Sequence, residues 1–171
     1  NSPTVTIDIH SPSSQKSPKK LCIPKFSTDY FHPMCNYFRF IFQNNVYYAC
    51  ERPRVREFLN VVCSLFDVYI YTAGLPSYAR QMIKHLCPQI GEDHCRYRNS
   101  CIYKRNRLYK NIASFSKTMN DVLIVDDNPE TFHFWPKNCI LCKPFWGEYD
   151  EKQLESNEFV NNLYMELNKC Q

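Results

Sequence analysis

Apolar and polar positions alternate along the chain in two ways, and each way predicts a different kind of element. At residues 52–66 and 75–86, apolar side chains recur every three or four positions, which is the spacing of one helix face. Pro53 stands where the first turn of a helix accepts proline, so the first helix is expected to include it. Shorter apolar and β-branched runs, typical of buried strands, occupy residues 4–9, 67–73, 121–125 and 138–145.

Two further segments complete the expected order of elements. The run YFRFIFQNNVYYAC predicts a β-hairpin that turns at Asn44-Asn45, because asparagine tolerates a positive φ angle. The Ser-, Pro- and Lys-rich residues 11–20 predict a loop. A closing helix is expected from apolar residues near the end of the chain, namely Leu154, Val160, Leu163 and Leu167.

Alternation of strands and helices predicts an α/β fold with a parallel sheet that is covered on both faces. At 171 residues the chain fits one domain, residues 1–171, with the hairpin as part of an insertion at about 21–51. Ligands of such sheets bind outside the carboxyl ends of the strands. Three of the predicted strands end in polar side chains, which should therefore meet at one rim: Asp8 and His10, then Thr72, then Asp126 and Asp127.

Composition narrows the class of protein. A hydrophobic content of 44% excludes a disordered chain, and no apolar run approaches the roughly 20 residues that span a bilayer. The ten cysteines lie mostly inside apolar segments, which is typical of small buried side chains in an intracellular, reducing compartment. Cys139 and Cys142 have CxxC spacing but no second pair, so zinc is disfavoured.

The formal charge of +4 is modest, but the basic residues are clustered. Such clusters favour an anionic partner such as a phosphopeptide, a nucleic acid or a lipid head group, although a solvated basic face would give the same pattern. The first cluster contains Arg96, Arg98, Lys104, Arg105, Arg107 and Lys110, and the second contains Lys16, Lys19, Lys20 and Lys25.

The predicted rim contains the groups that phosphoryl transfer needs. A carboxylate such as Asp8 can attack phosphorus and form an aspartyl-phosphate, provided that a cation reduces the repulsion between the two anions. Mg²⁺ suits this purpose and would be held by Asp8 and Asp126. Thr72 and the backbone N–H groups of residues 73–74 would bind phosphate oxygens, and Lys110 would neutralise negative charge.

The order of these groups resembles the haloacid dehalogenase superfamily. Within it, the chain is similar to the small phosphatases that act on the C-terminal domain of RNA polymerase II, also described as NLI-interacting-factor-like. The similar stretches are RPRVREFLNVVCSLFDVYIYTAGLPSYA, YRNSCIY and VLIVDDNPE. The likeness extends from about residue 4 to residue 167 and implies a Rossmann-like sheet, a β-hairpin inserted after the first strand, and descent from Mg²⁺-dependent phosphoserine and phosphothreonine phosphatases.

Roles for single residues follow from this resemblance. It implies that Asp8 is the nucleophile, that Thr72, with Ala73 and Gly74, binds phosphate, and that Lys110 is the lysine of the third motif. Asp126 matches the metal-binding acid, and Asp127 stands where these phosphatases usually carry Asn. Arg98 matches a substrate-side arginine. The backbone carbonyl of residue 10 is implied as a further metal ligand.

The first motif departs from the family pattern DxDx[TV], since it reads Asp8-Ile9-His10-Ser11-Pro12. The missing second aspartate should act as general acid and base, and losing such a group costs roughly 10²- to 10⁴-fold in rate. Pro12 also removes an N–H and restricts φ in a loop whose amides should face phosphate. Catalysis is therefore expected to be impaired.

Alternatives remain open at this point. His10 could serve as a surrogate acid and base in an active protein phosphatase, or could be a structural residue that caps the strand. The domain could also be a pseudophosphatase that binds a protein partner, like the receptor subunit of the mitochondrial inner-membrane translocase, or an RNA-binding subunit of a larger assembly. We expect the nucleus or cytoplasm as the compartment, and the mitochondrion if the domain resembles the translocase receptor in function.

Overall fold

The computed structural model describes residues 4–7, 36–116 and 119–145, with no side-chain description for residues 4–7. Asp8, His10, Pro12, the first part of the predicted insertion and the expected closing helix lie outside the described residues. Within the described part, no helix is long and apolar enough to cross a membrane.

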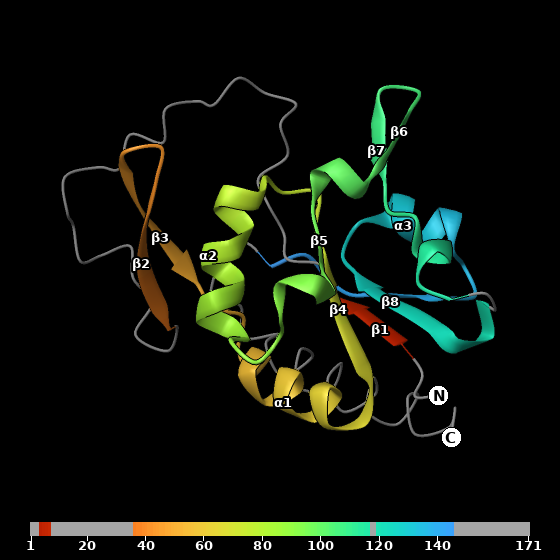
Figure 1. Cartoon of the computed structure of the whole chain (residues 1–171), viewed down its shortest axis with the longest axis horizontal. Coiled ribbons are helices and arrows are strands. Elements are labelled where there is room, and N and C mark those ends of the chain that lie inside the picture. The colour runs from red at the N-terminus through yellow and green to blue at the C-terminus, as the bar shows by residue number, and fades with distance from the viewer. Residues whose placement is uncertain (1–3, 8–35, 117–118, 146–171) are drawn as a thin grey trace.

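The core of the fold is a five-stranded parallel sheet (Figure 1). Its strand order is β5-β4-β1-β8-β9. The bounds are β1 Thr4–Ile7, β4 Asp67–Tyr71, β5 Cys95–Arg96, β8 Val122–Asp126 and β9 Cys139–Leu141. Strand β1 is central, and its last residue, Ile7, is level with Ile70 of β4 and Val125 of β8. The carboxyl ends of β4 and β8 therefore flank the end of β1.

Two helices, α1 (Val55–Leu65) and α2 (Pro76–Leu86), cover one face of the sheet. Successive side chains of a strand point to opposite faces, so Val68 and Ile70 pack with residues of these helices while Tyr69 and Tyr71 face the other way. The opposite face is covered by a second cluster that joins β8, the short turn η4 (Ile112–Ser114) and the residue after α3 (Pro129–Phe134). This arrangement confirms the predicted α/β fold.

Short 3₁₀ turns connect several of these elements. They are η2 (Glu92–His94), η3 (Arg98–Ser100) and η5 (Met119–Asp121).

Burial in the core raises the pKa of two cysteine thiols. Desolvation raises the pKa of Cys87 and that of Cys139 to about 12. Cys87, Cys95 and Cys139 are buried thiols, in accord with their expected role as small apolar side chains.

The predicted hairpin is present, but its turn lies one residue earlier than expected. Strands β2 (Tyr37–Phe42) and β3 (Asn45–Cys50) are joined through Gln43 and Asn44, whose φ angles are 48° and 60°. Two successive positive φ angles match the twist of the flanking strands. Asn45 instead pairs with Phe42 as the first residue of β3, and its amide donates to the Gln43 carbonyl at 2.9 Å.

The start of the first helix also differs from the prediction. Helix α1 begins at Val55, and its N-cap residue Arg54 has a left-handed φ of 61°. Pro53 therefore precedes the helix instead of lying in its first turn. A positive φ at Arg54 turns the chain sharply between β3 and α1 and allows an ion pair with Glu57.

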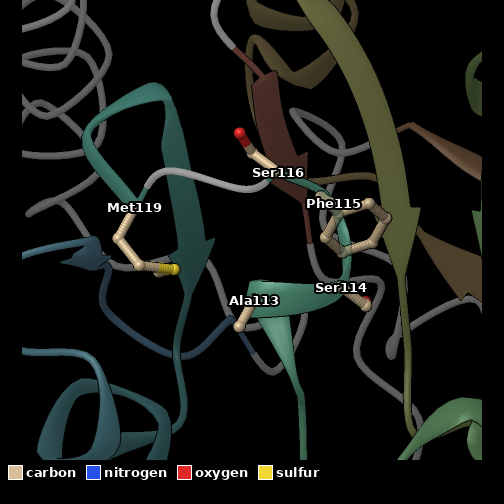
Figure 2. Close-up of a pocket in the computed structure, with 5 residues that line it drawn as sticks. All are labelled: Ala113, Ser114, Phe115, Ser116 and Met119. Carbon is tan, nitrogen blue, oxygen red and sulfur yellow. The ribbon is translucent and has the colours of Figure 1, made fainter.

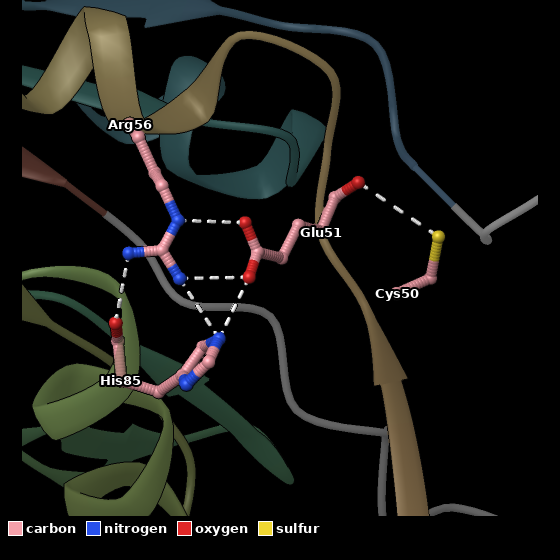
Figure 3. A network of polar contacts seen from close by, with 4 residues as sticks. All are labelled: Cys50, Glu51, Arg56 and His85. Atoms are coloured by element: carbon pink, nitrogen blue, oxygen red, sulfur yellow. Dashed lines mark hydrogen bonds and ion pairs between the residues drawn. The ribbon is translucent and has the colours of Figure 1, made fainter. Parts of the chain in front are cut away.

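A polar network of Glu51, Arg56 and His85 fastens the hairpin to both helices (Figure 3). The guanidinium of Arg56 donates to both carboxylate oxygens of Glu51, at 2.9 and 2.8 Å, and to the backbone carbonyl of His85 at 3.1 Å. The His85 ring lies 2.7 Å from the same carboxylate and stacks on Phe38 with 3.7 Å between ring centroids. Because Glu51 is 8% exposed, this pairing replaces water that its carboxylate would otherwise bind.

Replacing Glu51 with glutamine is expected to lower the free energy of unfolding at pH 7 by about 1.5–3 kcal/mol, since hydrogen bonds to charged groups are lost. The Arg56 hydrogen bonds lower the pKa of Glu51 below its ordinary value of 4.5. Its stabilising contribution is thus complete above pH 4.5 and is lost as the pH falls through the lowered pKa.

Urea unfolding of the parent and of Glu51→Gln between pH 7 and pH 3 measures this difference. It should shrink with acidification, and a constant difference would contradict the proposed ion pair. Glu57→Gln is the matched control, because the exposed Glu57 pairs only within its own helical turn and should change stability little.

Candidate functional site

Thr72, the first residue after β4, is fully buried at the carboxyl end of the sheet. Its backbone N–H donates to the carbonyl of Arg96 at 2.9 Å, and its hydroxyl oxygen accepts the N–H of Gly74 at 3.0 Å. These two hydrogen bonds fix the tight turn over residues 72–74. The Gly74 amide, which the sequence assigned to phosphate binding, is thereby directed at the Thr72 hydroxyl.

Arg98 closes this turn from the neighbouring chain segment. Its guanidinium Nε donates to the carbonyl of Ala73 at 2.6 Å, and its backbone N–H donates to the carbonyl of Gly74 at 3.2 Å. The structure therefore brings together Thr72, Ala73, Gly74 and Arg98, which the sequence had placed in one phosphate-binding group. A positive charge half-buried next to a turn with a buried hydroxyl suits an anionic ligand.

Lys110 and Asp126 form a buried ion pair at the end of β8. The ammonium of Lys110 lies 2.9 Å from Asp126 Oδ2, and the two side chains are 6% and 0% exposed. The other carboxylate oxygen of Asp126 accepts the backbone N–H of Asn128 at 2.9 Å. Two charges held in such a dry place interact strongly and keep a defined position.

Residues that the sequence interpretation overlooked hold this pair in place. Asn128 caps α3 by accepting the N–H of Glu130 at 3.0 Å, and the indole of Trp135 donates to the Lys110 carbonyl at 2.9 Å. On the other side, the Tyr71 hydroxyl donates to the carbonyl of Ser100 at 2.6 Å and accepts the N–H of Asn111 at 3.1 Å. The Asn128 cap could have been predicted from the sequence, because Asn followed by Pro is a common start of a helix. The contacts of Tyr71 and Trp135 join residues far apart in the sequence and could not.

The two groups lie on either side of β1. Thr72 follows β4 and Asp126 ends β8, and both strands pair with β1 as far as Ile7. Asp8 follows Ile7 in the sequence, but Asp8 and His10 are outside the described residues, so their assigned roles stay predictions. Asp127 is half-buried beside Asp126.

A metal ion at this rim would rely on the acids at the end of β8. Each oxygen of Asp126 accepts one hydrogen bond, while an ionised carboxylate offers about four acceptor positions, so the donor set suits Mg²⁺. Among residues 4–7, 36–116 and 119–145, no three His, Cys, Asp or Glu side chains gather in a way that could hold a metal. Further ligands would have to come from residues outside those ranges.

A pocket of about 460 Å³ lies beside η4, the turn that follows Lys110 (Figure 2). The described residues that line it are Ala113, Ser114, Phe115, Ser116 and Met119, and none of these five carries a charge. These described residues supply two hydroxyl groups and apolar surface, but no acid, base or cation. The groups at the ends of β4 and β8 are therefore the stronger candidate site.

Comparison with known proteins identifies related phosphatases. The curated relatives include CTD small phosphatase-like protein 2 of Dictyostelium discoideum, 30% identical over 67% of this chain and 21% of that protein. The human CTD small phosphatase-like protein is 29% identical over 63% of this chain and 39% of its own length. This chain thus spans well under half of the curated relatives that it matches.

Solved structures show the same fold. The fission yeast RNA polymerase II CTD phosphatase Fcp1 bound to beryllium fluoride matches 96% of this chain and 51% of its own, with a TM-score of 0.57 and 18% identity. A second Fcp1 structure gives the same TM-score of 0.57 at 17% identity. Residues 6–170 match the family described as NLI interacting factor-like phosphatase. The chain therefore belongs to this family of phosphatase domains, within the haloacid dehalogenase superfamily.

Proposed function

We propose that this domain binds phosphoserine or phosphothreonine segments of proteins at the ends of β4 and β8, and that His10 impairs turnover. The observation that supports binding most directly is the buried Lys110–Asp126 pair, which lies across the end of β1 from the buried hydroxyl of Thr72. Burying these groups costs free energy. Such a cost is typical of sites that must hold a charged ligand in one geometry.

In this proposal each group has a separate task. Thr72 bonds a non-bridging phosphate oxygen, and Lys110 places positive charge where negative charge develops. Arg98 keeps the 72–74 turn in shape and presents its charge to the substrate side. Mg²⁺, when bound by Asp8, Asp126 and Asp127, supplies charge neutralisation between the nucleophile and phosphate.

Asp8, as the nucleophile, would attack phosphorus and displace the serine or threonine oxygen, which needs a proton to leave. The aspartate that normally supplies this proton is replaced by His10. A nearby divalent cation disfavours the imidazolium form, and the longer ring places its proton elsewhere. Binding is therefore retained while the chemical step is slow. The phosphoprotein class of ligand is favoured because the relatives are named as phosphatases of the RNA polymerase II C-terminal domain.

Binding of a phosphoserine peptide with Mg²⁺, measured by isothermal titration calorimetry, tests the proposal. Thr72→Val should weaken affinity about 10-fold, because one hydrogen bond to a charged group is lost. Thr72→Ser is the matched control and should bind nearly as the parent does. Equal affinity of the parent and Thr72→Val for the phosphopeptide would refute the assignment of this site.

A further inference from the structure

A second hairpin, β6 (Ile102–Lys104) and β7 (Arg107–Tyr109), stands out from the body of the domain beside α3 (Figure 1). All three residues of β6 are exposed, with Ile102 at 48% and Tyr103 at 68%. The connecting residues Arg105 and Asn106 have φ angles of 51° and 60° and are exposed as well. An apolar strand that is exposed on both faces is unusual unless something covers it.

This hairpin is fastened to the candidate site. Arg107 forms an ion pair with Glu130, and the Tyr109 ring contacts that of Phe134 with 4.2 Å between centroids. Both partners belong to α3, which begins three residues after Asp126, the last residue of β8. Lys110 follows β7 without an intervening residue. The hairpin is therefore fixed to the same helix, α3, whose N-cap residue Asn128 donates its backbone N–H to Asp126.

The exposed edge and its charges indicate what could lie along it. Among the described residues, the sheet of β6 and β7 has two strands, so each retains an open edge to which an extended peptide can add. Lys104 and Arg105 at the tip make no ion pair with any described residue. Two unpaired cations beside exposed apolar side chains complement an acidic peptide in extended conformation.

The length of the hairpin sets how far from the phosphoresidue an acidic residue of the peptide would have to lie. From Lys110 to Arg105 the chain runs five residues, which in a strand is about 17 Å. A bound peptide in extended conformation advances at the same rate. A phosphoresidue placed at Lys110 would therefore bring residues about four to six positions away next to Lys104 and Arg105.

We propose that the β6–β7 hairpin extends the phosphate site into a docking strand that selects phosphopeptides with acidic residues about four to six positions from the phosphoresidue. This inference rests on the proposed function, because it uses the phosphate at Lys110 as the origin of the spacing. It assigns a role to the basic cluster that the catalytic groups do not use.

Fluorescence anisotropy of labelled phosphoserine peptides on the whole chain tests the spacing. One peptide carries glutamates at the stated positions before the phosphoserine, a second carries them after it, and a third carries alanines. One of the acidic peptides should bind about 10-fold more tightly than the alanine peptide at low salt, as expected for two or three exposed charge pairs. Lys104→Glu/Arg105→Glu should abolish that preference.

Lys84→Glu/Lys137→Glu is the matched control, since it makes the same change in net charge at exposed lysines of α2 and of the segment after α3. This control should change affinity less than 2-fold, because salt screens the interaction between the bound peptide and exposed charges that do not touch it. An equal loss in both double variants, or equal binding of acidic and alanine phosphopeptides, overturns the docking strand and leaves the proposed function standing.

Two further outcomes separate the hypotheses. If acidic peptides bind equally with and without phosphate, and only the hairpin variant weakens them, then the hairpin's preference for acidic peptides is supported and the phosphate site is refuted. An unstructured oligouridine that binds as tightly as the acidic phosphopeptide, and loses the same affinity in Lys104→Glu/Arg105→Glu, overturns the peptide specificity in favour of a nucleic-acid surface.

Discussion

Replacing His10 with aspartate is expected to raise phosphatase turnover about 10²- to 10⁴-fold, which is the usual contribution of a general acid and base. In the proposed mechanism the remaining groups include Thr72 and Asp126, which lie at the ends of the strands that flank β1, and Lys110, which pairs with Asp126. The variant restores only the missing proton donor. Hydrolysis of an aryl phosphate with Mg²⁺ measures the gain.

The double variant Asp8→Asn/His10→Asp is the control for this experiment. It should show no gain, because the nucleophile is absent while the new acid remains. If His10→Asp is as slow as the parent, the block lies elsewhere, for instance in the missing N–H of Pro12. A parent chain that is already as fast as His10→Asp would show that the imidazole works as a surrogate acid.

Replacing Lys110 with methionine is expected to lower the free energy of unfolding by about 3–5 kcal/mol, because it leaves the charge of Asp126 buried without its partner. The side chains have similar length, so the loss reports charge more than packing. Urea unfolding monitored by tryptophan fluorescence measures it.

Lys110→Met/Asp126→Asn should recover most of this loss, since it removes both charges and keeps an oxygen for the N–H of Asn128. Lys104→Met is the matched control at an exposed site and should stay within about 0.5 kcal/mol of the parent. A Lys110→Met variant as stable as this control would mean that the ion pair does not form in solution.

Long periodic segments could be predicted well from the sequence. The helices expected at 52–66 and 75–86 are present as α1 and α2. The strands expected at 67–73 and 121–125 are present as β4 and β8. Each helix buries one face and each of these strands is largely buried, so apolar residues recur in them in a regular pattern that is easy to recognise. The order of polar residues at their ends is the basis of the candidate site, and the roles assigned to these residues stay predictions.

Short elements were the ones missed. Strand β6 is three residues long and exposed throughout, so it has no apolar alternation, and its turn at Arg105-Asn106 lacks the usual glycine. The turn of the first hairpin was misplaced by one residue because Asn44-Asn45 and Gln43-Asn44 are nearly equivalent in sequence. The support of Lys110 by Trp135 depends on a contact between residues 25 apart and has no local signal.

The central position of β1 has a consequence for how this chain is made. Strand β1 leaves the ribosome before its two neighbours, β4 and β8. Its pairing with β8 joins Thr4 to Val122. The middle of the sheet therefore cannot close before Val122 has been synthesised, and pairing over such a long separation in sequence gives slow folding. Until then the edge of β1 that pairs with β8 has no partner strand, so we expect the nascent chain to aggregate more readily before β8 is made than after it.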